Sequence, residues 1–136
     1  MIYLDSAAVI KLLRREQETE ELVGWLNDRG TASLVSSALV EVEVPRALRR
    51  AAPQALVGVP TVLSRLYRIE IDATVRAAAG AYPEPMLRSL DAIHLATAEI
   101  LARQADADFI AFVTYDRRLL EAAKGVGLPV ASPGVD

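Results

Sequence analysis

The sequence predicts an α/β fold in which helices cover both faces of a central parallel sheet. Short apolar runs of strand length alternate with segments of helix length along the 136 residues. Strands and helices that alternate in this way favour parallel pairing with right-handed crossover connections. No internal repeat, low-complexity tract or long linker divides the chain. We therefore expect residues 1–136 to form one domain.

The chain begins with an apolar run over residues 2–4, which is typical of a buried strand. Ser6 can cap a helix over residues 7–15, so the first turn between strand and helix is expected to be very tight. A second helix opens near Thr19, and Gly30 is a typical helix stop.

Residues 32–36 are expected to form a second strand. A helix can start at Ser37 and continue to residue 51, although Pro45 should kink its axis or mark a boundary. Residues 40–44 alternate between valine and glutamate, a pattern that also fits a strand, so both interpretations stay open here.

The remainder continues the alternation, with a loop expected over residues 53–60 and a break at the proline-containing residues 82–85. Asp72 can cap an alanine-rich helix that ends near Gly80. The other predicted helices cover residues 61–66, about 87 or 89 to 104, and 117–124. The other predicted strands cover residues 67–71, 109–114 and 128–131, and the tail that follows is expected to fray.

Composition excludes several classes of protein. With 52% hydrophobic residues the chain can bury a sizeable core, and without cysteine it has no disulfide or thiolate metal site. The 15 basic and 18 acidic residues give a net charge of −3, so any contact with nucleic acid must be local. No apolar stretch approaches the roughly 18 residues of a membrane span, and the start carries no basic leader. A cytoplasmic protein is expected.

Three aspartates are predicted to meet at one edge of the sheet. Asp5 follows the first strand and Asp116 follows the fourth, and the carboxyl ends of parallel strands border the ligand crevice of such folds. Asp91 lies in the first turn of an otherwise apolar helix. Glu41 and Glu43 are two residues apart, and the helical period alone does not show which one faces inward.

Asp5 and Asp116 could each be a simple helix cap, since an aspartate after a strand often accepts the first free amide groups of a helix. A cluster of carboxylates, by contrast, would repel itself without compensation. Oxygen-only ligation with a single histidine and no cysteine favours Mg²⁺ or Mn²⁺ over Zn²⁺ as the compensating ion.

Four segments together resemble the PIN-domain ribonuclease toxins of VapBC-type toxin–antitoxin systems. They are residues 2–7, residues 36–48 with Glu-Val-Pro-Arg-Ala-Leu at 43–48, residues 89–98 with Leu-Asp-Ala-Ile-His at 90–94, and residues 113–119. The resemblance implies a three-layer α/β/α sandwich with a parallel sheet of about four to five strands. It also selects Glu43 over Glu41.

The resemblance further implies a metal-dependent endoribonuclease with catalytic residues Asp5, Glu43, Asp91 and Asp116. Asp5, Asp91 and Asp116 would be the ligands of Mg²⁺ or Mn²⁺, and Ser6 and Thr114 would support them. Glu43 and Asp116 would complete the cluster or orient an attacking water, so cleavage would leave a 5′-phosphate and a 3′-hydroxyl.

Partners follow from the same resemblance. The RNA substrate is expected to meet arginines near the acids, for which the candidates are Arg14, Arg46 and Arg117. A cognate antitoxin would place its tail in the crevice, and the alanine- and leucine-containing helices near residues 18–28 and 59–66 suit such a groove. A homodimer is also implied.

Parts of the sequence are also compatible with three other functions. A phosphatase or phosphoacceptor could use Asp5 as its nucleophile, but Ala7 stands where the haloacid dehalogenase pattern has a second aspartate. A serine hydrolase could use His94, but the sequence has no Gly-x-Ser-x-Gly elbow. His94 is therefore expected to be a packing or helix-surface residue, and otherwise an RNA contact or a residue that supports the site residues. The third is a non-catalytic protein-binding module with the same fold.

Overall fold

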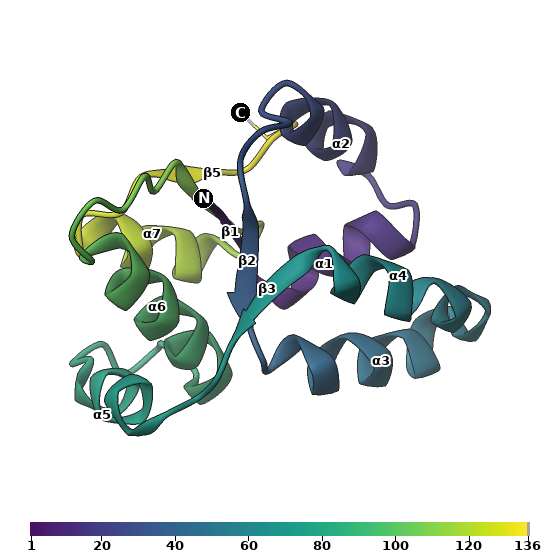
Figure 1. The fold of residues 1–136 in the computed structure, drawn as a ribbon. Coiled ribbons are helices and arrows are strands. Elements are labelled where there is room, and N and C mark those ends of the chain that lie inside the picture. The colour runs from purple at the N-terminus through teal and green to yellow at the C-terminus, as the bar shows by residue number, and fades with distance from the viewer. Residues whose placement is uncertain (136) are drawn as a thin grey trace.

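A five-stranded parallel sheet lies at the centre of the computed structural model, which describes residues 1–135 (Figure 1). Its strand order is β3-β2-β1-β4-β5, and each of the four neighbouring pairs is parallel. The strands are β1 (Ile2–Leu4), β2 (Leu34–Ser37), β3 (Leu66–Ile69), β4 (Ala111–Val113) and β5 (Val130–Ala131). The predicted α/β class and the parallel sheet are confirmed.

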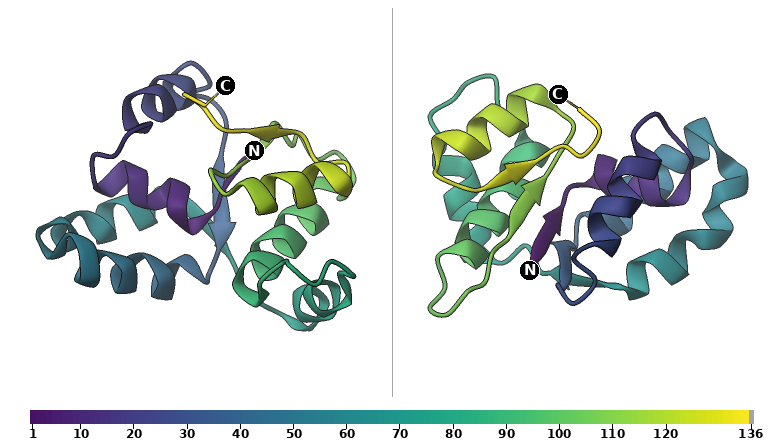
Figure 2. Two further views of the ribbon diagram at one scale, coloured as in Figure 1. Left: turned by 180° about the vertical axis from the view of Figure 1, so that it is seen from behind. Right: turned by 90° about the horizontal axis from the view of Figure 1, so that it is seen from above.

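Helices cover the sheet on both sides, which confirms the three-layer α/β/α sandwich (Figure 2). One layer contains α1 (Ser6–Leu13), α2 (Thr19–Asn27), α3 (Val40–Ala51), a 3₁₀ turn (Pro53–Gly58) and α4 (Val59–Ser64). The other contains α5 (Ala73–Ala81), α6 (Ser89–Ala102) and α7 (Arg117–Gly125). No helix within residues 1–135 is long and apolar enough to cross a membrane.

The alternation of side chains along β1 divides the core into two halves. Ile2 and Leu4 join the cluster under α1 and α3, whereas Tyr3 points into the cluster under α6 and α7. The rings of Tyr3 and Phe112 stack there with centroids 5.2 Å apart. Both faces of the central strands are thus buried, which explains why they are uninterrupted apolar runs.

The structure decides between the expectations for residues 40–60. The helical interpretation of residues 40–44 is confirmed and the strand interpretation is wrong, because α3 runs from Val40 to Ala51 with Pro45 inside it and not at a boundary. Val40, Val44 and Leu48, spaced four residues apart, are buried on one face of α3. Their packing in the core stabilises the helix despite the proline. Residues 53–60 form the 3₁₀ turn and the start of α4 rather than a loop.

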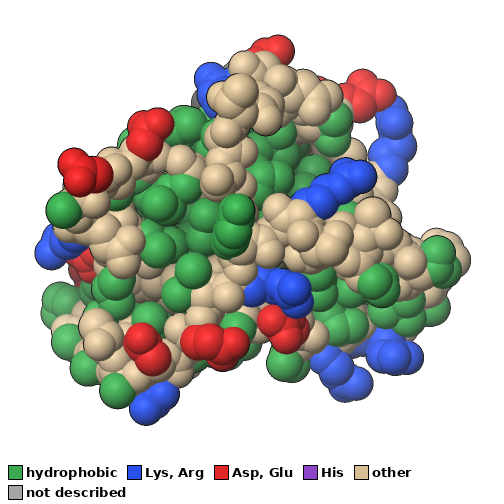
Figure 3. Space-filling view, viewed as in Figure 1, with side chains coloured by type: hydrophobic (Ala, Val, Ile, Leu, Met, Phe, Trp, Pro, Cys, Tyr) green, Lys and Arg blue, Asp and Glu red, His purple; other side chains and the backbone are tan. Residues whose placement is uncertain are grey.

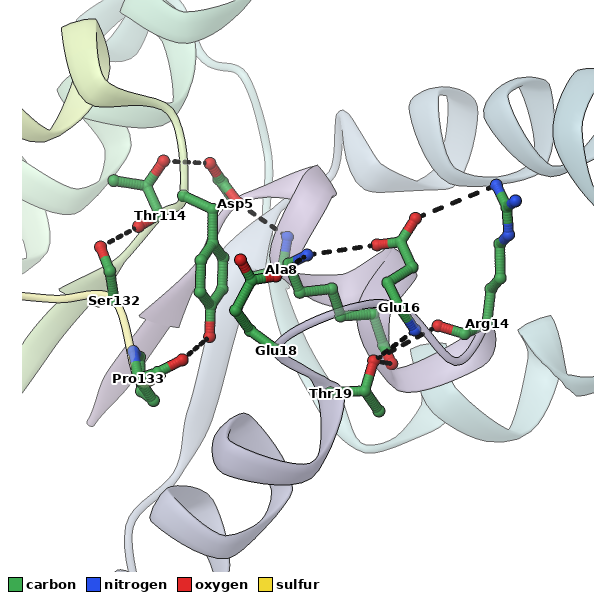
Figure 4. Close-up of polar contacts among 11 residues, drawn as sticks. Asp5, Ala8, Arg14, Glu16, Glu18, Thr19, Thr114, Ser132 and Pro133 are labelled. Atoms are coloured by element: carbon green, nitrogen blue, oxygen red, sulfur yellow. Dashed lines mark hydrogen bonds and ion pairs between the residues drawn. The ribbon is translucent and has the colours of Figure 1, made fainter. Parts of the chain in front are cut away.

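Two terminal details also differ from expectation. Asp5, not Ser6, caps α1, because its side chain accepts the amide of Ala8. The tail up to residue 135 is held against the fold and is not frayed. Ser132 donates to the carbonyl of Thr114, and the carbonyl of Pro133 accepts from the Tyr115 hydroxyl at 2.9 Å (Figure 4). Asp136, the last residue of that tail, lies outside the described residues.

Candidate active site

The pairing of β1 with β4 places the ends of these strands side by side. Leu4 is in register with Val113, so Asp5 and Thr114 leave the sheet together at its carboxyl edge. The Thr114 hydroxyl donates to Asp5 Oδ2 at 2.6 Å, and Asp5 Oδ1 accepts the Ala8 amide at 2.9 Å (Figure 4). Asp5 is therefore both a helix cap and a member of the site, and its side chain is rigidly held.

Asp116 is connected to the same hydroxyl. Its backbone amide donates to Thr114 Oγ1 at 3.1 Å, while its Oδ1 caps α7 by accepting the amides of Arg118 and Leu119 at 2.9 and 3.1 Å. Among residues 1–135 no group donates to its second carboxylate oxygen. One oxygen of Asp116 thus orders α7 and the other is free to meet a ligand.

All four predicted carboxylates line one cleft of ≈ 440 Å³. They come from four separate segments, namely the β1–α1 turn, α3, the first turn of α6 and the start of α7. The acids are Asp5, Glu43, Asp91 and Asp116, and Ser6 and His94 line the cleft beside them. The fold therefore brings together side chains that are up to 111 positions apart in the sequence.

The inward glutamate is Glu43. Its neighbour two residues earlier, Glu41, forms an ion pair of 3.3 Å with Arg68 and does not line the cleft. Glu43 Oε1 accepts the Ser6 hydroxyl and lies 2.9 Å from His94 Nε2. Two neighbours thus fix its carboxylate in the cleft.

His94 is more than a packing residue. Its ring is 2% exposed, and its Nδ1 lies 2.7 Å from the hydroxyl of the fully buried Tyr3. Burial raises the pKa of Tyr3 well above its usual value, so the phenol is neutral and its hydroxyl can donate to Nδ1. That assignment leaves the proton of a neutral ring on Nε2, where it meets Glu43. Tyr3, His94 and Glu43 therefore form a chain of hydrogen bonds from the core to the cleft.

The same contacts argue against two alternative chemistries. His94 Nε2 lies 3.0 Å from Ser6 Oγ, but Nδ1 faces a phenol where a catalytic triad has a carboxylate. Asp5 is 4% exposed and both of its oxygens already accept hydrogen bonds, which disfavours attack by this carboxylate as a nucleophile.

Burial and mutual repulsion shift the carboxyl groups in different directions. Burial raises the pKa of Asp5, against the opposing effects of His94 and the Thr114 hydrogen bond. Burial also raises the pKa of Asp91, and the charges of Asp116 and Asp5 raise it further. For Glu43, burial acts upward, but the hydrogen bonds from His94 and Ser6 outweigh it and the net shift in pKa is downward. The cleft thus combines a readily ionised carboxyl with two that resist ionisation.

Of the three arginines expected to meet RNA, two are near the acids. Arg46 lines the cleft, and Arg117 lines an adjoining hollow of ≈ 450 Å³ that shares Asp91 and Asp116 with it. Arg14 lines neither, because α1 carries it roughly 12 Å from Ser6 and it lies 3.9 Å from Glu16 (Figure 4). The structure therefore does not place Arg14 beside the acids.

The donor set of the cleft consists of carboxylate oxygens, because both nitrogens of His94 already have partners. Within residues 1–135 no three histidine, cysteine, aspartate or glutamate side chains lie close enough to enclose a metal ion directly. Mg²⁺ keeps several waters and needs only one or two carboxylates, so the arrangement fits a hydrated ion and not a closed cage. A separate hollow of ≈ 310 Å³, lined by residues of α1, α2, β2 and α4, contains no carboxylate.

Comparison with known proteins agrees with this geometry. The PIN domain family model matches residues 2–125. The chain belongs to the PIN domain family. It is 52% identical over 134 residues to Ribonuclease VapC35 of Mycobacterium tuberculosis, and the match covers 98% of each chain. It is 41% identical over 132 residues to Ribonuclease VapC46 of the same species, and this match covers 97% of each chain. The fold matches VapBC2 of Rickettsia felis, solved with a promoter DNA fragment, at a TM-score of 0.69 and 16% identity over 96% of this chain and 98% of that one.

The Tyr3–His94 contact of this PIN domain is expected to stabilise the fold. In Tyr3→Phe the buried Nδ1 of His94 loses its donor, and an unpaired buried group costs about 1–3 kcal/mol. Urea unfolding measures this loss. Tyr67→Phe is the matched control, because Tyr67 is 66% exposed and should change stability by less than about 0.5 kcal/mol. Equal stability of the two variants would contradict the role of the contact.

Asp91 is expected to make the metal-free protein less stable as pH rises. Since its pKa is raised in the folded state, folded protein binds the proton more tightly than unfolded protein, and stability is lost as pH climbs through the folded pKa. In EDTA, Asp91→Asn should therefore unfold at higher urea than wild type at pH 7, with a gain below about 1 kcal/mol because the side chain is half-exposed. The gain should shrink at pH 4.

The control for this pH effect is Asp108→Asn. Asp108 is exposed and precedes the first residue of β4, at the edge of the sheet opposite the cleft. A gain that is the same at both pH values, or that appears equally in the control, would show that charge repulsion in the cleft is not the cause.

Proposed function

We propose that this PIN-domain protein is a metal-dependent endoribonuclease and the toxin of a type II toxin–antitoxin module. The observation that carries the proposal is the convergence of Asp5, Glu43, Asp91 and Asp116 in one cleft at the carboxyl edge of the sheet. Two relatives with 52% and 41% identity over nearly the full chain carry the name ribonuclease, which supports the reaction class.

Asp5, Asp91 and Asp116 are the residues that we assign to Mg²⁺ or Mn²⁺, directly or through its waters. When bound, the ion supplies a more acidic water and stabilises charge on the phosphate that is attacked. Asp5 enters this role already oriented by Thr114 and Ala8. The raised pKa of Asp91 supports the assignment, because a nearby cation would favour the ionised form that the neighbouring acids disfavour.

Glu43 has a different part in the proposal. Its lowered pKa keeps it ionised, and the Ser6 and His94 contacts both reach Oε1, so Oε2 remains available to accept a hydrogen bond from water. A carboxylate held in this way can orient the attacking water. Because water and not the ribose 2′-hydroxyl attacks, the products carry a 5′-phosphate and a 3′-hydroxyl.

A cognate antitoxin is the proposed protein partner. Its tail would enter the open, acidic cleft, where a basic side chain would relieve the repulsion among the carboxylates. The apolar hollow beside α2 and α4, lined in part by Leu12, Val23 and Leu26, would suit the adjoining part of the same segment. We also propose that the protein forms a homodimer and acts in the cytoplasm.

Purified protein is expected to cleave members of an RNA panel with Mg²⁺ or Mn²⁺ and to lose this activity in EDTA. Asp5→Asn and Asp91→Asn should each lower the cleavage rate at least about 100-fold, whereas Asp108→Asn should not. End-group analysis should find 5′-phosphates. Cleavage that survives EDTA, or products with 2′,3′-cyclic phosphates, would rule out the metal-activated water.

Expression of the wild-type chain is expected to arrest bacterial growth, and co-expression of the gene product encoded beside it should restore growth. Asp5→Asn should not arrest growth, and circular dichroism of the purified variant should show a folded protein. Arrest by a variant without nuclease activity would favour a non-catalytic protein-binding module over a toxic ribonuclease.

A further inference from the structure

The acidic cleft is the middle of a longer groove. The cleft of ≈ 440 Å³ and the hollow of ≈ 450 Å³ are both lined by Asp91 and Asp116, so they meet at these two carboxylates. Beyond the acids on one side lies the cationic end of α3, and on the other lie the residue before α6 and the first turn of α7. The arginines that line the two ends are Arg46 and Arg50 on one side and Arg88, Arg117 and Arg118 on the other.

These five arginines differ from most others in the chain. Six of the thirteen arginines form an ion pair or donate to a backbone carbonyl, namely Arg14, Arg15, Arg29, Arg68, Arg76 and Arg103. Within residues 1–135 the five groove arginines have no such partner and are exposed. Guanidinium groups left unpaired on both sides of an acidic cleft suit a polyanion that reaches across it.

Exposed apolar side chains accompany the charges. Val42 and Leu90, 61% and 47% exposed, line the cleft, and Met86, 62% exposed, lines the hollow. A positively charged groove that follows a phosphate backbone is typical of sites for single strands, whose unstacked bases can stack on exposed guanidinium planes. Within residues 1–135 no phenylalanine, tyrosine or tryptophan ring lines the cleft or the hollow, so the arginines are the stacking surfaces here and the apolar side chains add contact area. In the view of Figure 3 a broad hydrophobic area lies over the middle and left of the molecule, and acidic and basic side chains lie along the lower margin.

We propose that single-stranded RNA lies across the carboxylates in an extended path, held by an α3 arm (Arg46 and Arg50) on one side and an α6–α7 arm (Arg88, Arg117 and Arg118) on the other. The phosphates that flank the cleavage point contact the two arms, and the phosphate between them lies over the acids. The inference rests on the proposed nuclease function and adds Arg50, Arg88 and Arg118 as substrate-positioning residues.

The path is tested by binding without cleavage. A fluorescent single-stranded RNA of about 12 nucleotides is titrated with the full-length protein in EDTA, and anisotropy gives the affinity at several salt concentrations. Arg50→Gln, Arg88→Gln and Arg118→Gln should each weaken binding at least about threefold and reduce the slope of log K against log salt by about 0.7. The same RNA annealed to its complement should bind more weakly than the single strand.

Arg49→Gln is the matched control. Arg49 precedes Arg50 on α3, is exposed and has no partner within residues 1–135, but it lines neither the cleft nor the hollow. The substitution removes the same charge as Arg50→Gln but outside the groove. The RNA affinity and the salt slope of Arg49→Gln should therefore stay near those of wild type. Circular dichroism and thermal unfolding should be unchanged in all four variants.

Several results would overturn the path. They are equal losses for Arg49→Gln and Arg50→Gln, an effect confined to one arm, equal binding of duplex and single strand, or wild-type RNA binding by the three groove variants. The last result would leave the arginines for a protein partner. Because binding is measured in EDTA, RNA held by both arms but never cleaved would support the path while removing the nuclease proposal. RNA cleavage that is unaffected in the three variants would support the nuclease proposal while removing the path.

Discussion

The parallel pairing of β1 with β4 is the constraint on which the site depends. It sets Leu4 opposite Val113, and this register brings Asp5 within reach of the Thr114 hydroxyl, which also accepts the amide of Asp116 two residues later. A slip of one residue would turn Tyr3 and Phe112 out of their shared core and Asp5 away from Thr114. The stacked pair in the core therefore fixes the position of the carboxylates at the edge.

Charged groups in this cleft are held by the same bonds that begin the helices. Burial of an unpaired carboxylate is costly, yet Asp5 is almost completely buried because the first turn of α1 and the Thr114 hydroxyl satisfy both of its oxygens. Asp116 caps α7 with one oxygen and keeps the other for the groove. Capping and ligand binding are thus not competing explanations for an aspartate after a strand, since one side chain has two oxygens.

Local patterns predicted much of this fold, and long-range contacts account for what they missed. The apolar run at residues 2–4 and the capping aspartate at residue 72 were recognisable because their signals lie within a few residues. Residues 53–60 were not, since a 3₁₀ turn and a short helix that each begin with a proline in the first two positions are stabilised by packing and not by propensity. The Tyr3–His94 bond joins residues 91 apart, and only a tyrosine in an apolar strand and a histidine on an apolar helix hinted that each needed a polar partner.

The net charge of −3 excluded a uniformly basic surface but could not describe the groove. Screening limits the range of a surface charge to about 10 Å at 0.1 M salt, so the nearby groups decide what a phosphate meets. Around the groove these are five arginines and four carboxylates. Asp5 is buried and Glu43 and Asp91 are half-buried, whereas Asp116 and all five arginines are exposed. An approaching strand therefore meets five guanidinium groups and one fully exposed carboxylate, and a cation bound among the acids would make the centre attractive as well.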